Sequence, residues 1–170
     1  MENLGLKFFD NYISENEEQL IISDIENFRK NNPKLVANYC SINFDTVYFG
    51  RRYNKNNMDD VPSTIVDVYN KLIADNLITE IPFGIAINKY QKGQKIAAHI
   101  DKPISGPIVS ILSLGYSSTM VFKKKNSDDI VQELYARSLV QMKDEIRNKW
   151  THEILPVKDL RYSIVFRSLK

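Results

Sequence analysis

Three residues of this chain have the types and the spacing of a metal site. The sequence contains two histidines: His99 opens a His-Ile-Asp triplet that ends at Asp101, and His152 follows 51 residues further on. Two neutral imidazoles and one carboxylate on one face of a metal form the facial triad that binds Fe(II) in non-haem oxygenases and leaves positions open for other ligands. A structural zinc site competes with this interpretation, but it needs four Cys or His ligands and only Cys40 remains as a fourth. The pattern therefore predicts an enzyme with His99, Asp101 and His152 as metal ligands and catalytic residues.

Two expected strands, one before and one after this triad, carry polar residues that are two positions apart. Residues two apart on a strand share a face, so Asn88 and Tyr90 should point the same way. On the later strand, Arg161, Ser163 and Arg167 should do the same. Burying two guanidinium groups without a counter-charge would be prohibitive, so both arginines need anionic partners. A small dicarboxylate near the metal would satisfy both.

The elements that must position these residues are predicted as helices early and strands late. Ser14 and Glu17 form a capping-box pattern for a first helix that should end before Asn31. A second helix is expected from about Pro62 to Asp75, and both helices should pack on one sheet. Short β-rich runs bounded by turn residues predict strands at 83–90, 94–100, 108–114, 120–124, 130–135, 139–142 and 161–168. Such an order indicates an α+β fold in which two packed sheets form a jelly-roll core backed by N-terminal helices.

Length and composition indicate one domain. A chain of 170 residues can bury one core but not two, and its 43% hydrophobic and 26% charged residues are those of an ordinary soluble protein. No apolar run approaches the roughly 18 residues of a membrane span, and the N-terminus lacks the pattern of a signal peptide. The single cysteine cannot form an internal disulfide, which fits a reducing compartment. These features favour a cytoplasmic protein without membrane contact, with a nuclear location as the alternative. We also expect a monomer, although no sequence pattern here addresses the oligomeric state.

The two halves of the chain differ in charge. Residues 1–85 hold 8 Lys/Arg against 13 Asp/Glu, and residues 86–170 hold 15 against 8, so their formal charges are −5 and +7. A basic half that carries the triad would suit a phosphate-bearing substrate. A solvated loop face explains the same lysines equally well. The lysines nearest to the triad in sequence are Lys89, Lys92, Lys95 and Lys102.

In their order and spacing these motifs resemble those of the AlkB-type Fe(II)/2-oxoglutarate dioxygenases. The resemblance covers roughly residues 83–168 and includes an Asn-Lys-Tyr motif at 88–90, the triplet at 99–101, Trp-Thr-His at 150–152 and the two arginines at 161 and 167. It implies a single domain over residues 1–170. Within it, residues 83–168 would form a double-stranded β-helix, the jelly-roll catalytic core, and residues 1–82 would supply helical support and a substrate lid.

The resemblance also implies the cofactors and their binding residues. Fe(II) would be held by the triad, and 2-oxoglutarate would chelate it and leave one position for O₂. Arg161 would pair bidentately with the far carboxylate of 2-oxoglutarate, and Arg167 would lie near the metal-bound carboxylate. The full set implied for the co-substrate is Asn88, Tyr90, Arg161, Ser163 and Arg167. Turnover would release succinate and CO₂.

A modified base in RNA or DNA is the substrate that the resemblance implies, with oxidative demethylation and release of formaldehyde preferred. Pro103 stands where family members that repair adenine and cytosine commonly have an acidic acceptor, and Ser163 stands where they often have asparagine. The stretch around Tyr48 is closer to relatives that hydroxylate a modified wobble uridine in tRNA, which is the alternative. A protein hydroxylase or demethylase, or a silent binding module, are further alternatives. The expected substrate contacts, partly in a lid over residues 44–61, are Tyr48, Arg51, Arg52, Tyr53 and Lys102.

Overall fold

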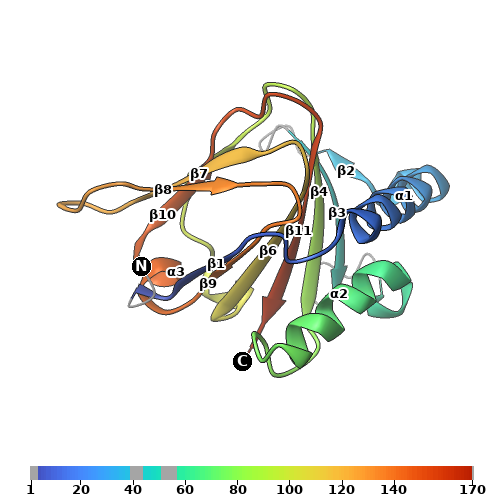
Figure 1. Cartoon of the computed structure of the whole chain (residues 1–170), viewed down its shortest axis with the longest axis horizontal. Coiled ribbons are helices and arrows are strands. Elements are labelled where there is room, and N and C mark those ends of the chain that lie inside the picture. Colours follow the sequence, from blue (N-terminus) through green and yellow to red (C-terminus); the bar gives the residue numbers. More distant parts are fainter. Residues whose placement is uncertain (1–3, 39–43, 51–56, 170) are drawn as a thin grey trace.

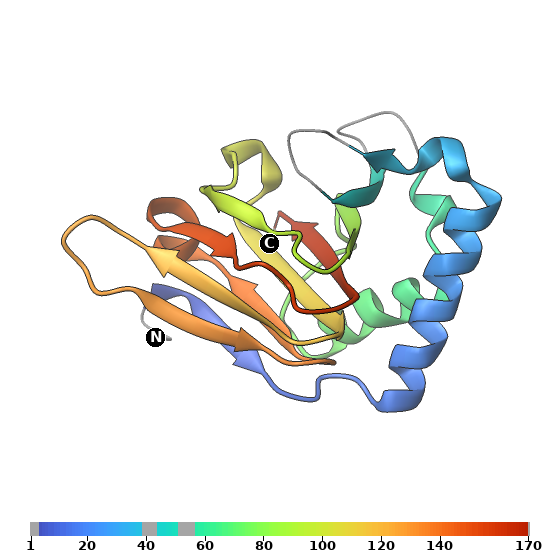
Figure 2. The same ribbon diagram turned by 90° about the horizontal axis from the view of Figure 1, so that it is seen from above.

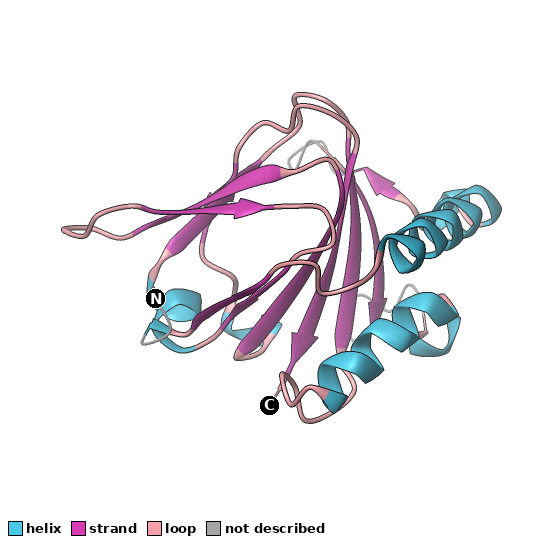
Figure 3. Cartoon of the chain, in the orientation of Figure 1, coloured by secondary structure: helices cyan, strands magenta, loops and turns pink. Residues whose placement is uncertain are grey.

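The strands of this protein form two antiparallel sheets, and the two longest helices lie outside the larger one (Figures 1 and 3). The computed structural model describes residues 4–38, 44–50 and 57–169. The larger sheet has the strand order β1-β9-β6-β11-β4-β3-β2, and the smaller one has the order β5-β10-β7-β8. Two packed antiparallel sheets backed by helices confirm the predicted α+β jelly-roll fold.

The larger sheet places β11 at its centre, between β6 and β4. Its strands are β1 (Leu6–Phe9), β2 (Ala37–Asn38), β3 (Asp45–Gly50), β4 (Gly84–Tyr90), β6 (Ile108–Gly115), β9 (Leu139–Met142) and β11 (Arg161–Ser168). The strands of the smaller sheet are β5 (Ile96–His99), β7 (Ser118–Lys123), β8 (Ile130–Leu134) and β10 (Thr151–Ile154). The helices are α1 (Glu15–Asn31), α2 (Ser63–Ala74) and α3 (Asp144–Lys149), with single 3₁₀ turns η2 (Pro33–Leu35), η3 (Met58–Asp60) and η4 (Pro103–Ser105).

Each face of the larger sheet is covered by its own hydrophobic core, and β11 shows how the sequence divides between them. Tyr162, Ile164 and Phe166 belong to the core on the face where α1 and α2 pack. Figure 2 shows these two helices from above, on one side of the larger sheet. Val165 belongs to the second core, which lies between the two sheets. This alternation follows from the two-residue period of a strand, and it sends the polar residues at 161, 163 and 167 to the side of the smaller sheet.

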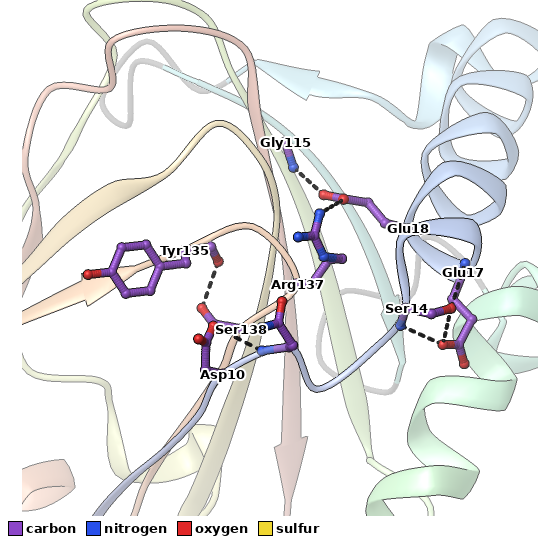
Figure 4. A network of polar contacts seen from close by, with 9 residues as sticks. Asp10, Ser14, Glu17, Glu18, Gly115, Tyr135, Arg137 and Ser138 are labelled. Atoms are coloured by element: carbon purple, nitrogen blue, oxygen red, sulfur yellow. Dashed lines mark hydrogen bonds and ion pairs between the residues drawn. The ribbon is translucent and has the colours of Figure 1, made fainter.

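The N-terminus of α1 is fixed by two glutamates with different roles (Figure 4). Glu17 completes the predicted capping box, since its side chain accepts from the Ser14 backbone N–H at 2.7 Å and the Ser14 hydroxyl accepts from the Glu17 N–H at 3.2 Å. Glu18 is buried and accepts from the Gly115 backbone N–H at 2.8 Å and from Arg137 at 3.0 Å. It therefore ties the helix to two turns of the sheets.

The expectation of helices early and strands late is wrong for three segments. β1, β2 and β3 precede residue 83 and all join the larger sheet. β1 has four residues and pairs with β9 about 130 residues later, so its identity is set by a distant partner rather than by a local pattern. Residues 45–50 of the expected lid are strand β3, which pairs with β4 inside the sheet, so this part cannot act as a lid.

The other differences are local. The helix over 144–149 and the strand over 151–154 were not predicted. The strand expected over 94–100 is shorter and ends at His99. No helix in the described residues is both long enough and apolar enough to cross a membrane.

Candidate active site

The predicted triad comes together at one end of the smaller sheet. His99 is the last residue of β5, His152 is the second residue of β10, and the two are paired across these strands with ring centroids 4.4 Å apart. Asp101 lies two residues beyond the end of β5, in the segment that leads to η4. One ligand atom from each residue lies within 4.8 Å of the others. The Asp101 carboxylate is 4.0 Å from His99 Nε2 and 3.9 Å from His152 Nε2.

The two imidazoles differ in their surroundings. His99 is exposed, and its Nδ1 lies 2.9 Å from the Ala97 carbonyl, which leaves Nε2 directed to the triad. His152 is buried, and burial lowers its pKa well below the ordinary value; nearby positive groups add to this effect and Asp101 opposes it. A neutral imidazole is the form that binds a metal, so two imidazoles and a carboxylate fit Fe(II) as a donor set.

A cavity of about 740 Å³ between the two sheets contains the triad. All five residues expected to bind the co-substrate line it, namely Asn88, Tyr90, Arg161, Ser163 and Arg167. Apolar walls are supplied by both sheets, with Val109, Ile111, Met120, Ile154 and Val165 among them. The structure therefore brings the whole predicted polar set into one cavity beside the predicted metal ligands.

Arg161 is a buried cation of this cavity that forms no ion pair with a described residue. Its side chain is only 1% exposed, and Nη2 donates to Ser113 Oγ at 3.1 Å. Its Nε and Nη1 have no hydrogen-bond partner among the described residues. Burial lowers the pKa of Arg161, but an arginine remains charged in proteins, so this guanidinium requires an anion. A bound carboxylate would supply one with bidentate geometry.

Neutral donors and a second arginine surround this anion site. Ser163 Oγ accepts from Asn88 Nδ2 at 3.2 Å and lies 3.3 Å from Tyr90 Oη. Arg167 lies over the Tyr48 ring, 5.9 Å from its centroid, and its Nε and Nη1 have no hydrogen-bond partner in the described part of the chain. Two guanidinium groups with free N–H donors on one cavity wall fit a dicarboxylate such as 2-oxoglutarate.

The expected substrate contacts divide into two groups. Tyr48 and Lys102 line the cavity. Tyr48 packs over Gly84, where a side chain would collide with the phenol. Arg51, Arg52 and Tyr53 fall outside the described residues.

Residues that sequence reasoning missed also reach the site. Ser113 on β6 holds Arg161. Lys95, which the sequence indicated only as one of the lysines near the triad, also lines the cavity. Arg147 on α3 donates to the backbone carbonyls of Asp101 and Lys102. The alternation of β6 could have indicated Ser113, since it faces Ser163 across the β6–β11 ladder. Nothing in the sequence pattern singles out Arg147, because its partners are backbone atoms.

Comparisons with known proteins agree with this geometry. The profile of the 2OG-Fe(II) oxygenase superfamily matches residues 5–167. The tRNA (carboxymethyluridine(34)-5-O)-methyltransferase alkbh8 of Xenopus tropicalis is 29% identical over 163 residues, which cover 91% of this chain and 26% of the relative. Its counterpart from Macaca fascicularis is 30% identical over 163 residues and is covered to 24%, against 88% of this chain. The chain thus spans about a quarter of the length of these relatives.

Solved structures share the fold. OsALKBH1 superposes with a TM-score of 0.67 at 14% identity and covers 96% of this chain and 98% of its own. A prolyl hydroxylase from Trichoplax adhaerens, in complex with a hypoxia inducible factor peptide, has a TM-score of 0.70 at 13% identity and covers 98% and 85%. The profile, the relatives and the arrangement of His99, Asp101 and His152 show a dioxygenase that uses Fe(II), 2-oxoglutarate and O₂. The chain therefore belongs to the 2OG-Fe(II) oxygenase superfamily and is AlkB-like.

Proposed function

We propose that this dioxygenase hydroxylates a modified uridine in tRNA. The observation that carries the substrate is the sequence relationship over nine tenths of this chain to enzymes named for carboxymethyluridine 34 of tRNA. Pro103 supports it, because this exposed residue beside Asp101 offers no side-chain acceptor. Adenine and cytosine carry an exocyclic amine that needs such an acceptor in a closed site, whereas uracil carries none.

In this proposal each group of residues that lines the cavity has one role. His99, Asp101 and His152 hold Fe(II), and Arg161 holds the far carboxylate of 2-oxoglutarate. With these bound, the metal supplies the oxidation: 2-oxoglutarate becomes succinate and CO₂, one oxygen atom of O₂ enters succinate and the other enters the substrate. The apolar walls exclude water from the reacting C–H bond.

Ser163 and its neighbours orient the co-substrate. Asn88 and Tyr90 already meet at Ser163 Oγ, so their donors are fixed before binding. Arg167 lines the same cavity as the triad, and its positive charge is one of the groups that lower the pKa of His152. It is therefore placed to balance the second carboxylate of 2-oxoglutarate.

Oxidative demethylation of an N-methylated base, preferred from the sequence, is the second candidate. The apolar side chains that line the cavity, Val109, Ile111 and Met120 among them, would accept a methyl group. The chemistry up to C–H oxidation is the same, and an N-hydroxymethyl product would release formaldehyde. The two candidates differ in their product, so one assay separates them.

The test is nucleoside mass spectrometry on bulk tRNA and on methylated DNA and RNA oligonucleotides, incubated with enzyme, Fe(II), 2-oxoglutarate and O₂. His99→Ala is the blank, and succinate is measured in parallel. A His99-dependent hydroxylated uridine supports the first candidate, and loss of a methylated base supports the second. Succinate formation with every nucleoside unchanged would refute a nucleic-acid substrate and favour a protein hydroxylase.

A further inference from the structure

Arg147 is a buried cation that touches the metal-site segment through its backbone. Its side chain is 1% exposed. Nη1 donates to the carbonyl of Asp101 at 2.9 Å, and Nη2 donates to the carbonyl of Lys102 at 2.8 Å. The rigid fork of a guanidinium matches two consecutive carbonyls in a way that a single ammonium cannot.

This arginine has no ion-pair partner within the residues 4–38, 44–50 and 57–169, and its Nε lacks a hydrogen bond there. Removing a guanidinium from water costs several kcal/mol unless other groups compensate. The two carbonyls provide that compensation, together with the negative charge of the nearby Asp101 carboxylate. A purely structural position would be filled at lower cost by an apolar side chain of similar volume.

The location of Arg147 connects the two segments that carry the triad. It lies five residues before His152, on the helix α3 that leads into β10. Ile146 and Trp150, on either side of it, are buried, so this helix is held against the core. The partners of Arg147 are 45 and 46 residues earlier in the chain.

The hydrogen bonds between β5 and β10 do not hold Asp101, so another contact must fix the position of its backbone. β5 ends at His99, and the β5–β10 pairing shifts register between His152 and Ile154. Beyond Asp101 the chain turns into η4, where Lys102 O also accepts from the Ser105 N–H at 2.8 Å. The segment that carries the Asp101 carboxylate therefore lies between a strand end and a turn, and Arg147 bonds to its middle.

We infer that Arg147 is a positioning residue, whose guanidinium holds the Asp101–Lys102 backbone at a fixed place relative to His152 so that the triad is ordered before a metal binds. The inference depends on the triad's role as metal ligands in the proposed function. It predicts that Arg147 acts on metal affinity and coordination geometry. Partners that orient metal ligands typically change metal affinity by 10–100-fold when they are removed.

The experiment measures binding of Mn(II) and Co(II) to the metal-free full chain by calorimetry, with thermal unfolding of the same samples. Arg147→Met removes both hydrogen bonds, and Arg147→Lys keeps the charge but reaches one carbonyl. Arg29→Lys is the matched control, because Arg29 is a largely buried arginine on α1 that bonds to Asp45 on the helix side of the sheet. The visible spectrum of bound Co(II) reports the geometry of its ligands.

We expect the dissociation constant of Mn(II) to rise about 10-fold or more in Arg147→Met, and nearly as much in Arg147→Lys, with a changed Co(II) spectrum. Arg29→Lys should lower the unfolding temperature without either effect. Should both Arg147 variants bind Mn(II) within twofold of the wild type, the inference is overturned even if their unfolding temperatures fall. The role of the triad would instead be overturned if the wild-type chain bound neither metal, or if His99→Ala bound them as tightly as the wild type.

Discussion

Arg161 stacks over Tyr90, with its guanidinium carbon 5.0 Å from the ring centroid, although no carboxylate of the described residues pairs with it. The ring provides weak cation–π stabilisation and fixes the plane of the guanidinium. Two of its nitrogens are left without partners, and they lie in the cavity wall beside the triad. The buried charge that is unfavourable in the empty protein is therefore the same group that should bind the co-substrate.

Arg161→Met should therefore separate co-substrate binding from stability. We expect the KM for 2-oxoglutarate to rise about 10-fold to 100-fold, because a charged bidentate contact is lost. The metal-free variant without 2-oxoglutarate should unfold at the same temperature as the wild type or higher, because an uncompensated buried charge is removed. Succinate formation at varied 2-oxoglutarate gives the first quantity and a melting curve gives the second. A large loss of stability with unchanged KM would contradict this account.

Exchange of either triad histidine should abolish metal binding, but the two should differ in stability. His152 is buried, so His152→Ala leaves a cavity and should cost about 1–2 kcal/mol in the free energy of unfolding. His99 is exposed, so His99→Ala should stay within about 0.5 kcal/mol of the wild type. Urea unfolding with a chelator present measures both. Equal costs for the two variants would mean that their burial is wrongly assigned.

Glu18→Ala should destabilise the protein by about 2 kcal/mol. The change leaves the Gly115 N–H without its acceptor and the Arg137 guanidinium without its counter-charge. The value stays below that of a fully buried pair because the Arg137 side chain is 30% exposed. Glu15→Ala is the control, because Glu15 lies about one helical turn earlier on an exposed face of the same helix. This change should lower the free energy of unfolding by less than about 0.5 kcal/mol.

The capping box at Ser14 should make part of the stability depend on pH. Hydrogen bonds from Ser14 lower the pKa of Glu17 below its ordinary value of 4.5. The folded-state pKa is thus below that of the unfolded chain, so the carboxylate stabilises the fold above pH 4.5 and this contribution is lost as the pH falls through the folded-state pKa. The deficit of Glu17→Gln in unfolding free energy should be largest at neutral pH and shrink in acid.

Period-two alternation predicted the site residues that a regular strand presents. The strand over 161–168 was predicted with its observed bounds, and Arg161, Ser163 and Arg167 share the cavity side, as expected. β10 was missed because His152 occupies one of its two buried positions, so the apolar alternation that reveals a strand is absent.

Features that depend on the ends of strands, on edge strands or on backbone atoms could not be predicted from the sequence pattern. Asp101 lies beyond the end of β5, yet its carboxylate lies within 4.8 Å of the ligand atoms of both histidines, which strand alternation alone does not predict. Arg147 binds carbonyl groups, which every residue type carries, so no partner residue in the sequence points to it. The two-residue strand β2 and the four-residue strand β1 form at the sheet margins through partners far along the chain.

The central place of β11 constrains how this domain is made. As the chain leaves the ribosome, β4 and β6 emerge long before β11, which lies between them in the sheet and pairs with both. Until residue 168 has emerged, the sheet has a gap at its middle, both hydrophobic layers are open, and Arg161 is still in water. Folding must therefore be completed after synthesis of the domain, and nascent chains that stop short of β11 are expected to need chaperones or to be degraded.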